Sequence, residues 1–273
     1  MQLRGPEARA TLLTDGGGMD MPPSLPDQPT ERLTGPPDFI GVGVQRCGTT
    51  RWFDLISSHP QVLGSVGAKE LHYFDRFFAG GCTAREIARY HEYFPRHGEG
   101  KTGEWTPMYA SAPWVPPLLA AAAPDARLLV LLRDPLERYL SGLQLDAGRA
   151  KKRGAPLSPY APFEQLVRGF YHTQLAGLLR HFDRSRILIL QYERCTLEPV
   201  PQLRRTFEFL GLNDVSFVPE LSARPQHQPN KPVLDAETRR AYVQAYEDDV
   251  QRLIGSFPEI DVSLWPNFAH LGE

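Results

Sequence analysis

The chain has 273 residues, with 30 Lys and Arg side chains against 32 Asp and Glu, so its formal net charge is −2 at pH 7. This length can bury the core of a full α/β domain, and the slightly acidic balance excludes a dedicated nucleic-acid binder, which needs a cationic surface. The three cysteines, Cys47, Cys82 and Cys195, form neither the even set of a disulfide framework nor the paired spacing of a zinc site. Their number and scatter predict a reducing compartment.

The N-terminal region differs in composition from the rest of the chain. Residues 1–37 are rich in proline and glycine and show no periodic apolar face, so we expect a disordered leader there and a single domain over residues 38–273. The leader lacks the pattern of a secretory signal, and nowhere do about 18 apolar residues run together. These features predict a cytoplasmic protein without stable membrane insertion, and they leave the oligomeric state open.

The remaining chain alternates between strand and helix patterns. Apolar strands are expected at residues 39–44, 127–132 and 187–192. Helices are expected from Gly48 to His59, from Pro135 onward, at 163–182, at 199–210 with Gly211 as the closing residue, and after Asp235. Alternation of this kind predicts an α/β fold with a central parallel sheet flanked by helices.

The first strand-loop-helix turn, residues 43–50, spells GVQRCGTT. It matches the phosphate-loop pattern G-x-x-x-x-G-K-[ST] in both glycines and the last hydroxyl residue, but Thr49 replaces the lysine and Arg46 supplies a cation. Backbone N–H groups at a helix N-terminus, together with the hydroxyls of Thr49 and Thr50, predict phosphate binding. The alternative is an ordinary turn in which the glycines only permit tight packing.

The second strand ends in Arg133-Asp134, where a nucleoside triphosphatase usually carries a Mg²⁺-binding aspartate. Asp134 is instead expected to cap the helix that begins at Pro135. Without the loop lysine and that aspartate, a donor less charged than a γ-phosphoryl group is favoured, such as a sulfuryl group, and no metal is required. The alternative for this motif is that Arg133 pairs with a surface carboxylate and Ser141 faces solvent.

Four segments in this order resemble the sulfotransferases that use 3'-phosphoadenosine 5'-phosphosulfate (PAPS), particularly the branch of bacterial and heparan-type enzymes. They are QRCGTT at 45–50, KELHYF at 69–74, GEWTPMY at 103–109 and RDPLERYLS at 133–141. GEWTPMY matches at lower specificity, as does the segment at 192–212. The resemblance implies a P-loop-like sulfotransferase fold in a single domain. It also implies PAPS as donor, adenosine 3',5'-bisphosphate (PAP) as product, and an acceptor hydroxyl on a small molecule, lipid or carbohydrate.

The resemblance also implies roles for particular residues. The loop at 45–50 is similar to the family's site for the 5'-phosphosulfate, and Arg133 with Ser141 to its site for the 3'-phosphate. Lys231, in a region with Arg224 and His227, stands where the family has a final donor-binding loop. The residues expected to bind the donor are therefore Arg46, Cys47, Gly48, Thr49, Thr50, Arg133, Ser141 and Lys231.

On the acceptor side, Glu70 occupies the place of the family's catalytic base, and His72 is the reserve candidate. In an extended segment these two side chains would point to the same face. Arg46, with Thr49 and Thr50, would stabilise charge on the leaving nucleotide. The alternative is that Lys69 and Glu70 form a solvated ion pair and His72 is a turn histidine.

Trp105 marks a departure from the family, since many relatives have a lysine at this position. With Tyr109 and Trp114 it offers apolar faces, which favours an aromatic or lipid-like alcohol over an anionic sugar polymer, unless Trp105 belongs to the core. Arg138 is expected to be a solvated helix residue, and Cys47 to fill a small pocket. Two other functions compete with the sulfotransferase: a small-molecule kinase that uses Mg²⁺ and ATP, and a nucleotide-binding scaffold without catalysis.

Overall fold

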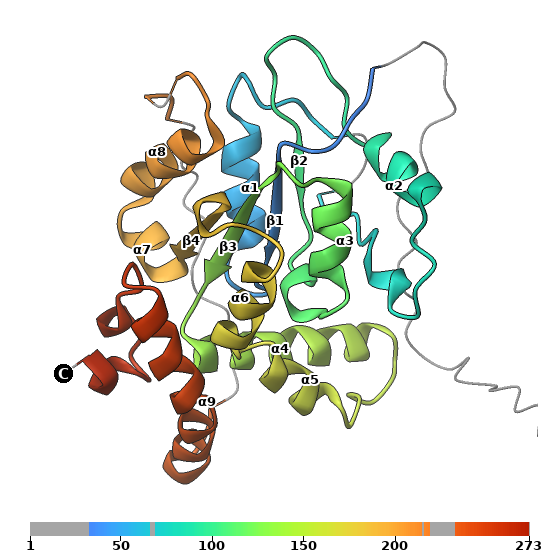
Figure 1. Cartoon of the computed structure of the whole chain (residues 1–273). Helices are drawn as coiled ribbons and strands as arrows, with labels where there is room; N and C mark the ends of the chain where they lie inside the picture. The colour runs from blue at the N-terminus through green and yellow to red at the C-terminus, as the bar shows by residue number, and fades with distance from the viewer. Residues whose placement is uncertain (1–32, 66–68, 215, 219–232, 273) are drawn as a thin grey trace, which may run out of the picture.

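The computed structural model describes residues 33–65, 69–214, 216–218 and 233–272. Its centre is a four-stranded parallel sheet in the order β2-β1-β3-β4 (Figure 1). The strands are β1 (Phe39–Gly43), β2 (Gly103–Trp105), β3 (Arg127–Leu132) and β4 (Ile187–Gln191). The parallel sheet confirms the predicted fold class, and three of its strands lie where the sequence predicts them. β2 was not predicted as a strand because its three residues are too short to show a pattern.

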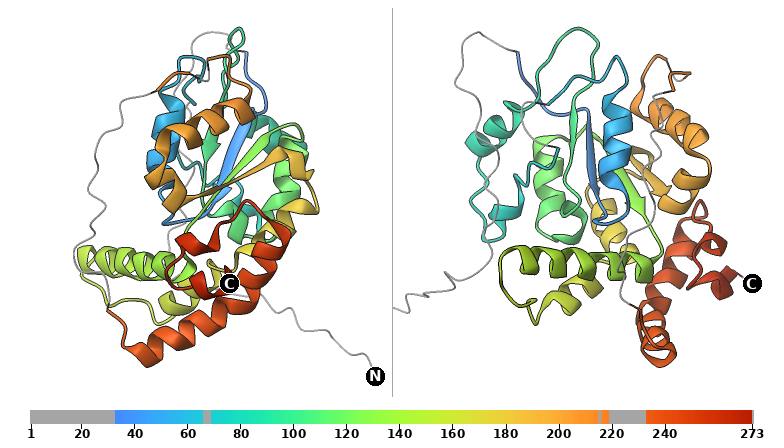
Figure 2. Two further views of the ribbon diagram at one scale, coloured as in Figure 1. Left: turned by 90° about the vertical axis from the view of Figure 1, so that its left-hand side faces the viewer. Right: turned by 180° about the vertical axis from the view of Figure 1, so that it is seen from behind.

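Helices cover both faces of the sheet, so all strand residues are buried except Arg127, which is half-buried at the start of β3. The helices are α1 (Thr49–Ser57), α2 (Ala84–His91), α3 (Val115–Ala122), α4 (Pro135–Lys152), α5 (Ala161–Val167), α6 (Tyr171–Leu179), α7 (Tyr192–Leu197), α8 (Pro199–Leu210) and α9 (Ala236–Ser256). α1 and α8 lie on one face and α3 on the other (Figure 2). Three further helices, α4, α5 and α9, gather beyond the carboxyl ends of the strands (Figure 1).

The predicted helix boundaries depend on caps that the structure contains. Asp134 accepts hydrogen bonds from the N–H groups of Leu136 and Glu137 at the start of α4. Asp235 accepts one from Thr238 N–H at the start of α9, and Gly211 ends α8 with a left-handed φ of 69°. Side-chain caps and a C-terminal glycine are local signals, so sequence alone could find them.

The helix expected at 163–182 is wrong: the structure has two helices, α5 and α6. The break is stabilised by α9, whose Asp249 accepts hydrogen bonds from His172 N–H at 2.9 Å and Thr173 N–H at 3.2 Å. Asp249 therefore caps the first turn of α6 from 76 or more residues away in the sequence. A continuous apolar pattern cannot reveal a cap that arrives through tertiary packing.

The predicted leader lies for the most part outside the described residues. Its described end pairs with the chain that precedes β2: Arg96 N–H donates to Leu33 O at 2.8 Å and Gly35 N–H to Phe94 O at 3.2 Å. Residues 33–35 thus belong to the edge of the folded domain.

Gly41 allows β1 and β2 to approach closely, because a Cβ at this position would overlap the ring of Trp105. We therefore expect Gly41→Ala to lower the free energy of unfolding by about 1–3 kcal/mol through overpacking. Gly177 is the control, because it lies within α6 and a Cβ added there would meet no atom within 4 Å. Gly177→Ala should raise the free energy of unfolding by roughly 0.5–1 kcal/mol. Urea titration of both variants measures the difference, and equal stabilities would contradict the packing argument.

Candidate functional site

The candidate site lies at the carboxyl edge of the sheet. β1 runs into the loop at residues 44–48, β3 into Arg133, and β4 into Tyr192. Parallel strands of an open α/β sheet end at one edge, and ligands of such folds bind in the crevice outside that edge. The topology therefore brings together the motifs that lie almost 150 residues apart in the sequence.

The loop before α1 has the backbone geometry of an anion-binding turn. Gly48 precedes the helix with a φ of 86°, and a Cβ there would meet the Tyr192 ring at 2.9 Å, so no larger residue fits. Among the residues that the structure describes, no side chain caps the N-terminus of α1, so its first N–H groups are available to an anion. Arg46 also has a positive φ, 71°, a conformation that costs free energy in a non-glycine residue.

Arg46 connects the two predicted donor motifs. Its Nε donates to Ser141 Oγ at 3.0 Å, and its carbonyl oxygen accepts a hydrogen bond from Arg133 Nη1 at 3.3 Å. The Arg133 guanidinium also lies over the Tyr192 ring, with Cζ 4.7 Å from its centroid. Of the alternative interpretation, one part holds, because Arg133 Nη2 lies 3.9 Å from Glu137 Oε2, and one part is wrong, because Ser141 is buried rather than facing solvent. The structure therefore places Arg46, Arg133 and Ser141 in one cluster.

Several positive charges lie close together in this cluster, so binding of an anion there would be favourable. Burial, together with the like charges of Arg133 and Arg149, lowers the pKa of Arg46. Arg168, which sequence analysis did not identify, adds a further cation: its Nη1 donates to Gln45 Oε1 at 2.8 Å. It lies just after α5, inside the segment that the sequence predicted as continuous helix. A negatively charged group bound here would relieve the repulsion among these guanidinium groups.

The other predicted residues of the loop differ in accessibility. Thr49 is buried at the start of α1, and Thr50 is exposed. Cys47 is fully buried, with its Sγ 4.0 Å from the Tyr171 hydroxyl, and burial raises the pKa of its thiol to about 12. Cys47 therefore fills a pocket as an uncharged thiol, as expected. The predicted Lys231 lies outside the described residues, as do Arg224 and His227.

The interpretation of Arg138 as a solvated residue is wrong. Its side chain is fully buried in α4 and donates to both the side-chain and backbone oxygens of Gln165. The helical wheel of α4 alone does not show this, because α5 packs over the face that carries Arg138.

The segment with the candidate base forms a turn rather than a strand, and His72 has a positive φ of 51°. Glu70 lies between two cations: Lys69 Nζ is 2.7 Å from its Oε1, and His72 Nε2 is 3.3 Å from its Oε2. His72 Nδ1 in turn lies 2.6 Å from Asp75 Oδ2. The Lys69–Glu70 pair is half-buried, not solvated, and Glu70 and His72 meet as the alternation argument expected, although by another backbone path.

These contacts determine which group can accept a proton. Burial alone would raise the pKa of Glu70, but hydrogen bonds from His72 and Lys69 and the charge of Lys69 outweigh it and lower the pKa to about 2. The carboxylates of Asp75 and Glu70 raise the pKa of His72 to about 10. At neutral pH Glu70 is therefore an anion and His72 a cation, so only Glu70 can take up a proton. Among the described residues, no hydrogen bond or ion pair joins Glu70 to Arg46.

A buried carboxylate, Glu104, holds this turn in place. Its Oε1 accepts hydrogen bonds from Tyr90 at 2.8 Å and Tyr109 at 3.2 Å, and its Oε2 from Thr106 Oγ1 at 2.6 Å and Leu71 N–H at 3.4 Å. Burial raises the pKa of Glu104 to about 6, against the hydrogen bonds that lower it. Sequence analysis had selected the segment that contains Glu104 but assigned it no role.

The same network reaches the next two residues of the turn. His72 N–H donates to Thr106 Oγ1 at 3.3 Å, and Tyr73 N–H to the Tyr109 hydroxyl at 3.0 Å. Three successive backbone N–H groups thus end on Glu104 or on its direct partners. This arrangement defines the orientation of the turn that carries Glu70.

The proposal that Trp105 and Tyr109 present apolar faces to an acceptor is wrong. Both side chains are completely buried. Trp105 Nε1 donates to Gly43 O at 3.2 Å, which ties the end of β2 to the end of β1. Trp114 is exposed by 37% and is the one member of the three that reaches the surface. Trp105 belongs to the core, so it gives no information about the acceptor.

Asp134 and Glu193 connect the site to the C-terminal segment. The second oxygen of Asp134 accepts hydrogen bonds from Asn267 N–H at 3.1 Å and Asn267 Nδ2 at 2.9 Å, and Glu193 Oε2 accepts one from Trp265 Nε1 at 3.0 Å. Asp134 is fully buried and both of its oxygens are in use. It is therefore committed to structure. Within the described ranges, no group of three or more His, Cys, Asp or Glu side chains is arranged to hold a metal ion.

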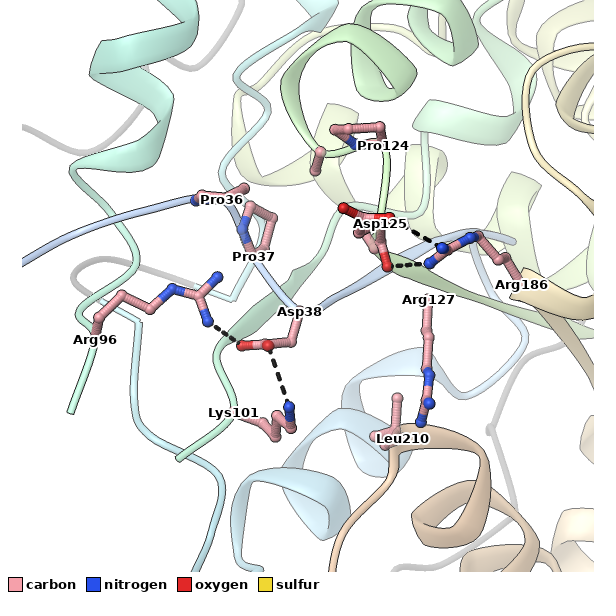
Figure 3. A pocket seen from close by; sticks show the side chains of 12 residues that line it. Pro36, Pro37, Asp38, Arg96, Lys101, Pro124, Asp125, Arg127, Arg186 and Leu210 are labelled. Carbon is pink, nitrogen blue, oxygen red and sulfur yellow. Dashed lines mark hydrogen bonds and ion pairs between the residues drawn. The ribbon is translucent and has the colours of Figure 1, made fainter. Parts of the chain in front are cut away.

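A cavity of about 310 Å³ opens at the opposite, amino edge of the sheet (Figure 3). Arg96 and Lys101 pair there with Asp38, at 2.6 and 3.5 Å, and Arg186 pairs with Asp125 at 2.9 Å. Because this cavity lies where the strands begin, it is separate from the site formed where they end.

Comparisons with known proteins agree with this architecture. The sulfotransferase domain family matches residues 36–220, more than half of the chain, and the chain belongs to this family. Mouse heparan sulfate glucosamine 3-O-sulfotransferase 3A1 is 31% identical over 191 residues, which cover 66% of this chain and 47% of that protein. The chain therefore spans about half the length of this relative. The membrane-associated sulfotransferase kil1 of Dictyostelium discoideum is 32% identical over 131 residues, 48% of this chain and 27% of that protein.

The fold is also found among solved structures. The crystal structure of a sulfotransferase from Alicyclobacillus acidocaldarius superimposes with a TM-score of 0.62 at 20% identity, covering 84% of this chain and 98% of that one. The family match and the shared fold confirm the resemblance recognised in the sequence.

The relatives contradict the expected cytoplasmic location. One is by name membrane-associated, and others are by name enzymes of heparan sulfate. The expectation failed because composition and the three free cysteines are properties of the folded domain and do not determine its location in the cell. In the part of the chain that the structure describes, none of the helices combines the length and the apolar character needed to span a bilayer.

The charge state of His72 can be tested directly. An NMR titration of its ring should give a midpoint near the pKa of about 10, because the ring is held between two carboxylates. The interaction stabilises the folded state fully below pH 6.5, the ordinary pKa of the ring, and is lost as pH rises through about 10. Asp75→Asn should move the midpoint down toward 6.5, whereas Asp183→Asn, a surface control, should leave it unchanged. A wild-type midpoint near 6.5 would contradict the arrangement.

Proposed function

We propose that this protein transfers a sulfuryl group from PAPS to a hydroxyl of an acceptor. The observation that carries the proposal is the contact of the loop at 44–48 with the second basic motif, through Arg46, Ser141 and Arg133. A nucleotide with anionic groups at both its 5' and 3' positions needs two adjacent anion sites. The uncapped start of α1 and the guanidinium pair support such sites.

In the proposed complex, the first N–H groups of α1 with Thr49 and Thr50 bind the 5'-phosphosulfate, and Arg133 and Ser141 bind the 3'-phosphate. Arg46 exchanges its contact with Ser141 for one with the oxygen that bridges sulfur and phosphorus. As that S–O bond breaks, its electron pair stays on the nucleotide phosphate, where the guanidinium stabilises the new charge. The products are PAP and the sulfated acceptor.

Glu70 accepts the proton of the attacking hydroxyl in this proposal. Its partners hold its pKa at about 2, so the carboxylate is ionised at every physiological pH. A base this weak removes the proton only once the hydroxyl oxygen has begun to bond to sulfur and has become acidic. Protonated His72 then orients the carboxylate and does not compete as a base.

The choice of acceptors to test is supported by the relatives and by the corrected role of Trp105. Burial of Trp105 and Tyr109 removes the argument for an aromatic or lipid-like alcohol. Because the relative from mouse is named for the glucosamine of heparan sulfate, a carbohydrate hydroxyl is the first acceptor to test. Lipid and aromatic alcohols form the comparison series.

Ligand preference separates the proposed function from a kinase. PAP at about 100 times its Kd should stabilise the protein by roughly 2.7 kcal/mol, whereas ATP with Mg²⁺ should stabilise it far less, because Asp134 is engaged as a cap. Arg133→Ala should remove most of the shift in melting temperature caused by PAP, and Arg204→Ala, on the exposed face of α8, should keep it. A larger shift with ATP and Mg²⁺ than with PAP would favour the kinase.

Turnover tests the role of Glu70 and separates an enzyme from a scaffold. With ³⁵S-labelled PAPS and a panel of carbohydrate, lipid and aromatic alcohols, Glu70→Gln should lower kcat by about 10²–10⁴-fold while leaving the Kd of PAP unchanged. Glu92→Gln, an exposed glutamate after α2, is the matched control and should behave as wild type. Normal turnover of Glu70→Gln would exclude it as the base, and donor binding without turnover on any acceptor would indicate a scaffold.

A further inference from the structure

The connection between α4 and α5 carries a concentrated positive charge. Residues 147–163 contain four basic residues and no Asp or Glu, in a chain whose net charge is −2. All four side chains are exposed: Arg149, Lys151, Lys152 and Arg153. A cluster of four exposed Lys and Arg side chains is large enough to attract an anionic surface.

The same segment exposes large apolar side chains. Tyr160 is exposed by 70% and Phe163 by 66%, with Leu157 and Val167 at 39% each. Most of the large apolar side chains of the described chain are buried in its core. An exposed cluster of apolar side chains next to polar residues marks an interaction site, because its exposure to water is unfavourable.

Hydrogen bonds between α4 and α5 hold this segment in position. Gln165 of α5 donates to Asp146 of α4 at 2.7 Å and accepts a hydrogen bond from the buried Arg138 at 3.1 Å. In the left view of Figure 2, α4 projects from the body of the molecule, and the connection to α5 lies at its tip. The exposed side chains are therefore held away from the sheet, where an extended flat partner can reach them.

We propose that residues 149–167, the basic-aromatic segment, dock this protein on the surface of a membrane that contains anionic lipid. Such a surface offers negative headgroups for the four cations and an apolar layer for Tyr160 and Phe163. An acidic polysaccharide would pair with the four cations but would offer no apolar layer to Tyr160 and Phe163. The one acidic residue within this segment, Glu164, has its Oε2 3.8 Å from Arg168 Nη2, so its charge is partly offset.

The docking surface begins beside the candidate donor site. Arg149 lies near enough to Arg46 for its charge to contribute to the lowered pKa of that guanidinium. Docking through the basic-aromatic segment would therefore place the membrane on the side of the molecule that carries the candidate donor site. The inference does not depend on the proposed sulfuryl transfer, because binding to vesicles can be measured without donor or acceptor.

Co-sedimentation of the full chain with vesicles tests the proposal. The protein should pellet with vesicles of phosphatidylcholine and phosphatidylserine, and far less with phosphatidylcholine alone. Each basic residue is expected to strengthen binding about fivefold, so Lys151→Ser/Lys152→Ser/Arg153→Ser should weaken it by roughly a hundredfold. Binding should also fall as salt rises from about 0.05 to about 0.5 M, because the charges are exposed. Lys151→Arg/Lys152→Arg should bind as wild type.

The aromatic pair separates a membrane from a polyanion in solution. Tyr160→Ser/Phe163→Ser should lower vesicle binding at least tenfold, because the apolar contact is lost, while binding to soluble dextran sulfate stays unchanged. Phe78→Ser is the control, since Phe78 is exposed by 61% but lies outside the segment. The fluorescence of Tyr160→Trp, compared with wild type, should shift to shorter wavelength only with anionic vesicles.

Two results would overturn the proposal. One is wild-type protein that does not pellet with phosphatidylserine vesicles at low salt. The other is vesicle binding that survives loss of both aromatic side chains, which would assign the segment to polyanions in solution. Because these substitutions lie on the surface, unchanged melting temperatures would show that each variant is folded.

Discussion

The hydrogen bonds to Glu104 are the constraint on which the candidate active site depends. A carboxylate without partners is too costly to bury, and each oxygen of Glu104 receives two hydrogen bonds. The donors come from three parts of the chain: α2, the segment after β2, and the turn at 69–74. Because the carboxylate must satisfy all of them at once, it fixes the position of a turn that has no regular secondary structure of its own.

The guanidinium cluster at the ends of β1 and β3 differs from Glu104, because its charges repel one another instead of being satisfied. Glu104 collects donors around one acceptor, whereas Arg46, Arg133 and Arg149 bring together positive charges, and burial together with the like charges of Arg133 and Arg149 lowers the pKa of Arg46. Structural stability alone does not require such a cluster, and its position at the ends of β1 and β3 is where the fold binds ligands. The candidate site thus combines a turn fixed by hydrogen bonds, proposed as the acceptor side, with a cationic cluster, proposed as the donor side, that an anion would stabilise.

Much of this arrangement could be predicted from local sequence signals. The strands β1, β3 and β4 are runs of apolar residues, and the caps at Asp134 and Asp235 are set by a few neighbouring residues. Residues 43–50 indicate the turn between β1 and α1 through Gly43 and Gly48. Motifs that follow parallel strands meet at one edge, so the proximity of Arg46 and Arg133 was within reach of the sequence.

What the sequence could not show depends on distant contacts. The break between α5 and α6 is stabilised by Asp249, and the burial of Arg138 results from the packing of α5. The sequence suggested that Trp105 contacts the acceptor. Its ring instead packs against β1, where Gly41 has no side chain and so leaves room for it. In each case the residue type was known, but the partner that decides its role lies tens of residues away.

The hydrogen bonds between Asn267 and Asp134 have a consequence for how the protein matures. They span 133 residues, and Asn267 lies beyond the region matched by the family. As the chain leaves the ribosome, the sheet and the helices around it can assemble well before Asn267 has been synthesised. The capping aspartate beside Arg133 gains its last partner only then, so the edge that carries the candidate site is complete only after Asn267 has been synthesised.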